Sequence, residues 1–176
     1  MADPQDIEAF MRDYRARTQI HDALMRSCRG VDRLDRELIL SAYHPGAHDN
    51  HGSFAGPVED FVDWVFGNHQ GKVQSCVHHL GNVLMRIEGS VAYVESYVLA
   101  CHRRELDGKL IDLLSHGRYI DRFEDRDGEW RIAERHVVFD WDRIDPVEQR
   151  WEGPLTQMLE VGQRNREDAS YRMLPA

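Results

Sequence analysis

The chain has 176 residues, of which 41% are hydrophobic and 30% are charged. These values are those of one folded domain with a core of its own, and they exclude a disordered chain. The formal net charge of −9 excludes the clustered basic surfaces that bind nucleic acid or anionic lipid.

The helical part of the sequence comes first. Asp3 and Pro4 form a helix start, and apolar residues then recur at helical spacing to about residue 30. After Asp35 a second, short helix is expected, which Pro45 stops. Each helix has an apolar stripe that needs a partner.

Strands make up the next part. A brief strand from Ala47 to His51 and a third helix that opens at Gly56 and Pro57 are expected before it. From Val73 onward the pattern favours four long strands, residues 73–87, 91–105, 110–124 and 130–142. Hairpin-length loops make them an antiparallel meander, which curls. The predicted fold is an α+β cone, a curved antiparallel β-sheet wrapped by the three N-terminal helices, with a cavity inside.

The domain is expected to cover residues 1–145, followed by a tail over residues 146–176. The tail carries three prolines, and a short helix is predicted near Leu155 to Val161. Its role as a pocket lid, an oligomer contact or neither stays open.

The cysteines and the apolar runs indicate location. Cys28, Cys76 and Cys101 are odd in number and widely spaced, which fits neither a disulfide framework nor close zinc-binding pairs. A reducing, cytoplasmic location is therefore expected. No apolar run reaches the roughly 20 residues that span a bilayer, and the first residues lack the features of a signal peptide. The sequence predicts no membrane partner.

Four stretches of the sequence resemble a known family. They are Gly30-Val31-Asp32, Tyr43-His44-Pro45 through Gly52 to Gly56-Pro57, His78-His79-Leu80-Gly81-Asn82, and Gly117-Arg118-Tyr119 through Trp130 to Arg135. In order and spacing they resemble the SnoaL-like branch of the nuclear transport factor 2-like superfamily. That branch includes scytalone dehydratase, bile acid 7α-dehydratase, lindane dehydrochlorinase and polyketide cyclases. The resemblance implies the cone-shaped fold and a homo-oligomer, a trimer or a dimer.

The resemblance also implies a catalytic site made of Asp32, His78 and Arg135. A neutral imidazole accepts a proton from an activated carbon at cellular pH, so His78 is the candidate base. A carboxylate on the far ring nitrogen fixes the tautomer, the role given to Asp32. Arg135 would stabilise developing negative charge. No cofactor is implied, because all three groups are side chains.

Each of these residues also has an ordinary structural explanation. Asp32 could be a helix cap or a surface charge, and Arg135 could lie in solvent. His78 could be a core histidine, and its neighbour His79 competes with it because adjacent strand residues face opposite ways. The offset to Asn82 favours His78.

Other polar residues are candidates for substrate binding: Asp49, Asn82, Tyr97 and Tyr43, with His51 as an alternative to Asp49. The run from His48 to His51 is not predicted to bind a metal, because strand alternation splits it between two faces and catalytic zinc wants three protein ligands. The dehydratases use a pocket tyrosine, and its offset in the bile acid enzyme gives Ser27 here. A tyrosine from elsewhere, such as Tyr97, could substitute for it; without one, a different elimination or an isomerisation is favoured. His102 and His116 are further candidates.

The predicted function is a cofactor-independent lyase. It would remove a proton beside a carbonyl or a leaving group of a small hydrophobic cyclic substrate, such as a steroid, polyketide or aromatic-derived compound, and eliminate water. An isomerase or cyclase would use the same groups. A non-catalytic small-molecule binding protein, or a structural subunit like the β chains of ring-hydroxylating dioxygenases, is the alternative outside the enzymes.

Overall fold

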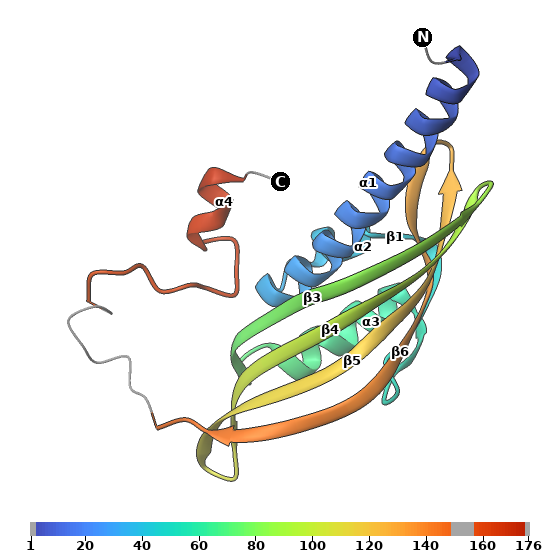
Figure 1. The fold of residues 1–176 in the computed structure, drawn as a ribbon. Coiled ribbons are helices and arrows are strands. Elements are labelled where there is room, and N and C mark those ends of the chain that lie inside the picture. The colour runs from blue at the N-terminus through green and yellow to red at the C-terminus, as the bar shows by residue number, and fades with distance from the viewer. Residues whose placement is uncertain (1–2, 149–156, 175–176) are drawn as a thin grey trace.

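The computed structural model describes residues 3–148 and 157–174 (Figure 1). The helices are α1 (Pro4–Arg33), α2 (Arg36–Ser41), α3 (Val58–His69) and α4 (Ala169–Met173). The strands are β1 (Tyr43–Asn50), β2 (Ala55–Pro57), β3 (Val73–Glu88), β4 (Val91–Leu106), β5 (Lys109–Arg126) and β6 (Glu129–Pro146). The three helices and four long strands that the sequence predicts are present, and the α+β fold is confirmed.

The sheet contains all six strands in the order β2-β1-β6-β5-β4-β3. Neighbouring strands are antiparallel, except that β1 runs parallel to β6. This parallel pair differs from the antiparallel sheet that the sequence predicts. The chain between β1 and β6 comprises β2, α3 and the strands β3 to β5, so the two strands are far apart in sequence and are not joined by a hairpin. The long strands curve together around α3, so that the sheet has a concave inner face (Figure 1).

Local sequence sets the ends of the helices. The Asp3 side chain caps α1 by accepting from the Gln5 amide at 2.9 Å, and Asp35 caps α2 by accepting from the Leu38 amide at 3.1 Å. α2 ends at Ser41, earlier than expected, because Tyr43 already pairs with β6. The first strand is correspondingly longer than predicted and includes Pro45.

The core lies between the inner face of the sheet and the helices. Its centre is formed by fully buried aliphatic and aromatic side chains, among them Ile20, Leu24, Ile39, Val62 and Phe123. The turn between α1 and α2 brings the two helices very close at Gly30, where an added Cβ would lie 2.6 Å from Ile39 Cγ1. This close approach fixes the end of α1, which carries Asp32.

The tail differs from its prediction. Leu155 lies outside the described residues, and residues 157–161 contain turns and no helix. The tail helix is α4 instead, which Asp168 caps by accepting from the Ser170 amide. The tail returns to the body of the protein, where the Tyr171 hydroxyl donates to Asp35 at 2.8 Å. Among the described residues, no helix is long and apolar enough to cross a membrane.

Candidate active site

A cavity of about 460 Å³ lies between the sheet and the helices. α1 contributes Ser27, Cys28 and Val31 to its wall, and α3 contributes Phe61 and Trp64. Strands β3 to β6 supply most of the rest, and His51 and Ser53 join them from the segment after β1. Cavities of roughly 300–1,000 Å³ with mostly apolar walls are typical of small-molecule sites.

Asp32 and His78 meet at this cavity. Asp32 stands in the last turn of α1 and His78 on the inner face of β3, and the ring Nδ1 lies 2.6 Å from the carboxylate Oδ1. The backbone N–H of His78 donates to the other oxygen at 3.1 Å. Their side chains are only 9% and 14% exposed, and His78 lines the cavity. With Nδ1 held by the carboxylate, Nε2 is the nitrogen left to exchange a proton.

The carboxylate of this pair is held in its charged form. Burial alone would raise the pKa of Asp32, but the hydrogen bonds and charge of His78 outweigh it and keep that pKa below its usual 3.8. An ionised Asp32 fixes the ring orientation of His78 and stabilises the imidazolium that proton abstraction would create.

The structure separates the residues near His78. His79 is exposed on the other face of β3, so His78 is the histidine that lines the cavity. Asn82 was expected on the same face as His78 but is exposed and absent from the wall. The reason is an irregularity in the β3–β4 register between Leu80 and Val83. This bulge breaks the alternation, so that Asn82 turns outward.

Arg135 lines the cavity, but its charge is already paired. The guanidinium donates through Nε and Nη2 to the Asp121 carboxylate at 2.8 and 2.7 Å, and through Nη1 to Ser27 Oγ at 2.9 Å. It lies 4.0 Å from the Tyr119 ring centroid, and only 2% of its side chain is exposed. Burial would lower the pKa of Arg135, but the charge of Asp121 raises it, so the guanidinium stays protonated. This arrangement holds Arg135 as part of a buried ion pair.

The other three predicted substrate-binding residues, like Asn82, lie outside the wall. Tyr97 is 38% exposed, because it alternates with buried Ser96 and Val98 and so faces away from the cavity. Tyr43 and Asp49 are 1% and 0% exposed and lie behind the wall, with the tyrosine hydroxyl donating to Asp49 at 2.8 Å. Tyr97, Tyr43 and Asp49 are therefore not among the residues that line the cavity.

Two residues take their places at the wall. His51 lines the cavity, and its Nδ1 contacts the Asp49 carboxylate. Tyr119 also lines the cavity, and burial raises its pKa well above 10. Its hydroxyl is therefore protonated at neutral pH, and Tyr119, unlike Tyr97, is a tyrosine of the cavity wall.

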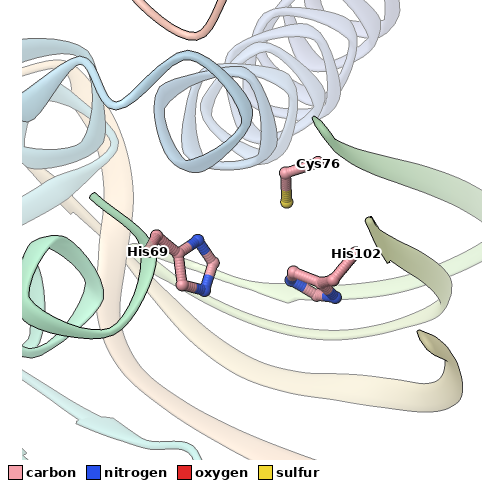
Figure 2. A group of neighbouring side chains, drawn as sticks. All are labelled: His69, Cys76 and His102. Carbon is pink, nitrogen blue, oxygen red and sulfur yellow. The ribbon is translucent and has the colours of Figure 1, made fainter. Parts of the chain in front are cut away.

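A second group of donors lies directly beside the Asp32–His78 pair. Figure 2 shows His69 from the end of α3, Cys76 from β3 and His102 from β4 pointing toward one another. Their ligand atoms lie within 4.8 Å of one another, and imidazole and thiolate are donors that zinc accepts. Burial lowers the pKa of His69 to about 4 and of His102 to about 3, and it raises that of Cys76. The rings are neutral and the thiol is protonated at pH 7.

The tail argues against a metal at this cluster. Arg164 donates to His69 Nδ1 at 3.1 Å, so the proton of the neutral ring resides on Nε2. Neither nitrogen of His69 then offers a free lone pair. Arg164 also donates to the backbone carbonyls of Asp32, Val73 and Val31 at 2.9, 3.0 and 2.9 Å. The tail thus supplies a cation of its own that joins the end of α1 to the start of β3.

A family model described as a SnoaL-like domain matches residues 12–136. The chain belongs to the SnoaL-like family. This SnoaL-like domain has no match among the curated proteins searched.

Solved structures show the same fold. A scytalone dehydratase-like protein from Novosphingobium aromaticivorans is 18% identical, with a TM-score of 0.67 over 76% of this chain and 90% of that one. The hexachlorocyclohexane dehydrochlorinase LinA-type3 from Novosphingobium barchaimii is 17% identical, with a TM-score of 0.69 over 82% and 98%. A protein of unknown function with a cystatin-like fold from Nostoc punctiforme is 16% identical, with a TM-score of 0.59 over 70% and 90%. These likenesses support the cone-shaped fold of the SnoaL-like domain.

Some residues of the site escaped the sequence prediction. No sequence pattern indicates His69 or Arg164 as site residues. His69 ends a helix and Arg164 lies in the tail, so the alternation of residues along a strand does not predict which way their side chains point. Tyr119 could have been found, since it lies on the same face of β5 as buried Asp121 and Phe123. The family resemblance includes Tyr119 in a longer stretch and assigns it no role of its own.

Proposed function

We propose that the protein is a cofactor-independent lyase in which His78 removes a proton from carbon. The observation that carries this proposal is the 2.6 Å contact between His78 and Asp32 at the wall of a mostly apolar cavity. General bases of this kind contribute about 10²–10⁴-fold to a rate. The dehydratase and dehydrochlorinase names among the structural neighbours support the same class of reaction.

The cavity suggests the kind of substrate. Phe61, Trp64, Val98 and Val137 give the wall its apolar character, and they favour a small hydrophobic, cyclic molecule such as a steroid, polyketide or aromatic-derived compound. A carbonyl next to the reacting carbon would make the proton acidic enough for an imidazole. The Tyr119 hydroxyl is the group we assign to polarise that carbonyl, because it is a protonated donor at the same wall.

The roles of the remaining predicted residues follow from their contacts. Asp32 orients His78 and stabilises its protonated form. Arg135 supports the wall through Asp121 and Ser27 and is not assigned direct contact with a substrate anion. An isomerase or cyclase would share the first step of this mechanism, the removal of the proton by His78.

The first step can be tested without the natural substrate. A base at His78 would exchange the α-protons of a cyclic ketone with deuterium from heavy water, which NMR detects. We expect the wild type to accelerate exchange for some members of a panel of bicyclic ketones and the His78→Gln variant to lose about a hundredfold or more. The matched control is His79→Gln, which alters the exposed neighbour and should leave the rate unchanged.

The outcomes separate enzyme from binding protein. Exchange that persists in His78→Gln, or that falls equally in His79→Gln, would contradict the base assignment. Ketones that bind to the wild type with no acceleration of exchange would favour the non-catalytic binding protein.

We also propose that the protein forms a homo-oligomer, a dimer or a trimer, through the outer face of the sheet. Large apolar side chains are exposed there on neighbouring strands, with Leu84 71%, Tyr93 52% and Ile120 38% exposed. Exposed apolar side chains in one region indicate an interaction surface. Light scattering coupled to size-exclusion chromatography would give the mass, and Leu84→Glu should reduce it to that of a monomer.

A further inference from the structure

The cavity wall carries a second histidine that is bound to a carboxylate. His51 directly follows β1 and contacts Asp49 of that strand through Nδ1. Its ring stacks on Phe61 with the centroids 4.5 Å apart and lies near Tyr119 at 6.1 Å. The His78 ring lies instead beside His102, at 5.7 Å. The two histidines therefore occupy separate parts of one cavity, each with its own carboxylate.

Contacts on both sides fix the orientation of His51. Asp49 holds Nδ1, and the carboxylate is held in turn by the Tyr43 hydroxyl at 2.8 Å. The backbone N–H of His51 donates to the Phe54 carbonyl at 2.8 Å. Among the described residues no group hydrogen-bonds to Nε2, and the side chain is 20% exposed. Nε2 is therefore the nitrogen of His51 that is available to a molecule in the cavity.

The buried Asp49 carboxylate has no arginine partner among the described residues. Asp49 and Asp121 are 0% and 2% exposed, and one buried guanidinium, Arg135, lies between the strands that carry them. Arg135 donates to both oxygens of Asp121 and to neither oxygen of Asp49. An unpaired carboxylate in a dry interior is costly. The His51 ring is in contact with this carboxylate and is the group beside it that can carry a balancing positive charge.

We propose that His51 is the general acid of the site and donates its Nε2 proton to the group that leaves the substrate. This inference rests on the proposed function, in which His78 is the base. It assigns the acid to a different histidine, so that one residue takes the proton from carbon while another supplies a proton to oxygen.

His78 Nε2 takes the proton from the carbon next to the carbonyl, and the electron pair of that C–H bond becomes the new C=C bond. The bond between the β-carbon and its hydroxyl oxygen breaks, and that oxygen takes the proton of His51 Nε2 and leaves as water. His78 then releases its proton to solvent, and His51 regains one from solvent.

The acid restricts the class of substrate. Hydroxide is a poor leaving group that needs a proton, whereas chloride leaves without one. A dedicated acid is therefore useful to a dehydratase and of no use to a dehydrochlorinase. The substrate class that the cavity selects is a cyclic β-hydroxy carbonyl compound.

The experiment compares two leaving groups on one carbon skeleton. The probes are a bicyclic β-hydroxy ketone of the decalone type and its β-chloro analogue, and enone formation above the buffer rate is followed by absorbance. We expect His51→Gln to lose about a hundredfold on the hydroxy ketone and less than about tenfold on the chloro ketone. His78→Gln should lose activity on both. His48→Gln, a change at the exposed histidine of the same strand, is the control and should change neither rate.

The chloro ketone also reports whether a variant is folded, since a variant that still eliminates chloride has an intact site. Equal losses of His51→Gln on the two probes, or no loss on either, would overturn the assignment of the acid while leaving the base in place. A wild type that eliminates chloride and not water would overturn it too.

If the wild type reacts with neither probe, the proposed function fails. The contact between His51 and a substrate hydroxyl is then tested by measuring the affinity for ligands. A hydroxyl within reach of His51 should then improve the affinity for the β-hydroxy ketone over the unsubstituted ketone, and His51→Gln should abolish the difference. A hydroxyl that adds no affinity in the wild type would rule out the contact.

Discussion

Replacing Asp121 with asparagine would leave the Arg135 guanidinium charged and buried without its counter-ion. The two side chains are 2% and 0% exposed, and they share two hydrogen bonds of 2.8 and 2.7 Å. Removing one partner of a buried pair costs about 3–5 kcal/mol. For a domain of roughly this size each kcal/mol lowers Tm by about 2–4 °C, so the expected loss is about 6–20 °C.

The same strand offers a matched control. Asp112 of β5 also accepts two hydrogen bonds from one arginine, Arg103, at 2.8 and 2.7 Å. Those side chains are 22% and 21% exposed, and pairs in contact with solvent contribute only about 0–1 kcal/mol. Asp112→Asn should therefore lower Tm by less than about 4 °C.

Urea unfolding followed by far-UV circular dichroism, with the two variants and the wild type at pH 7, gives the free energies directly. If Asp121→Asn costs no more than Asp112→Asn, the guanidinium does not depend on Asp121 for its charge balance. Arg135 would then be free to stabilise charge on a substrate, as the family resemblance implies, and the supporting role assigned to it here would be wrong.

Three other changes test the helix junction, the histidine cluster and the tail. Gly30→Ala places a Cβ within 2.6 Å of Ile39 in α2, and it should lower the free energy of unfolding by about 1–3 kcal/mol, as thermal unfolding would show. In the control Gly67→Ala in α3, the added Cβ meets nothing within 4 Å, so this change should be neutral or stabilising. Burial lowers the pKa of His102 from 6.5 to about 3, so between these pH values the unfolded chain binds a proton that the native state does not. The free energy of unfolding should therefore fall as the pH drops through that window, and His102→Phe should make this dependence on pH less steep. Arg164→Gln removes donors to three backbone carbonyls and should speed hydrogen exchange in the last turn of α1, while Arg172→Gln at an exposed tail position should not.

The sequence predicts the elements of this fold because their signals are local. Periodicity locates α1, α3 and the long strands to within a few residues of their bounds, and hairpin loops make β3 to β6 neighbours without further information. The parallel pairing of β1 with β6 depends on contacts between distant segments, which no local pattern encodes. The helix end predicted at Pro45 is wrong, because Pro45 lies in β1 between the two points at which that strand pairs with β6.

Prediction of the site was more uneven, for the same reason. His78 and Asp32 could be paired because a family offset joins them across 46 residues, and the structure brings them into contact. Asn82 was misplaced because one bulge reverses the side to which a strand residue points. Tyr43 and Asp49 were expected at the cavity, but the depth of a side chain behind the wall depends on the neighbours that cover it. The carboxylate partner of Arg135 is Asp121, a cross-strand neighbour that charge patterns alone do not identify.

The buried polar groups beside the cavity bear on whether the site is catalytic. Asp49, Asp121 and Arg135 lie almost without solvent contact, and replacing such charged groups by well-packed apolar residues is often neutral or stabilising. Stability therefore does not explain why they are present. Each of them contacts a residue of the wall. Asp49 contacts His51, Arg135 donates to Ser27, and Asp121 accepts from Arg135. A fold that only had to hold an apolar ligand would gain from an apolar layer here, so the retained charges favour a site that moves protons.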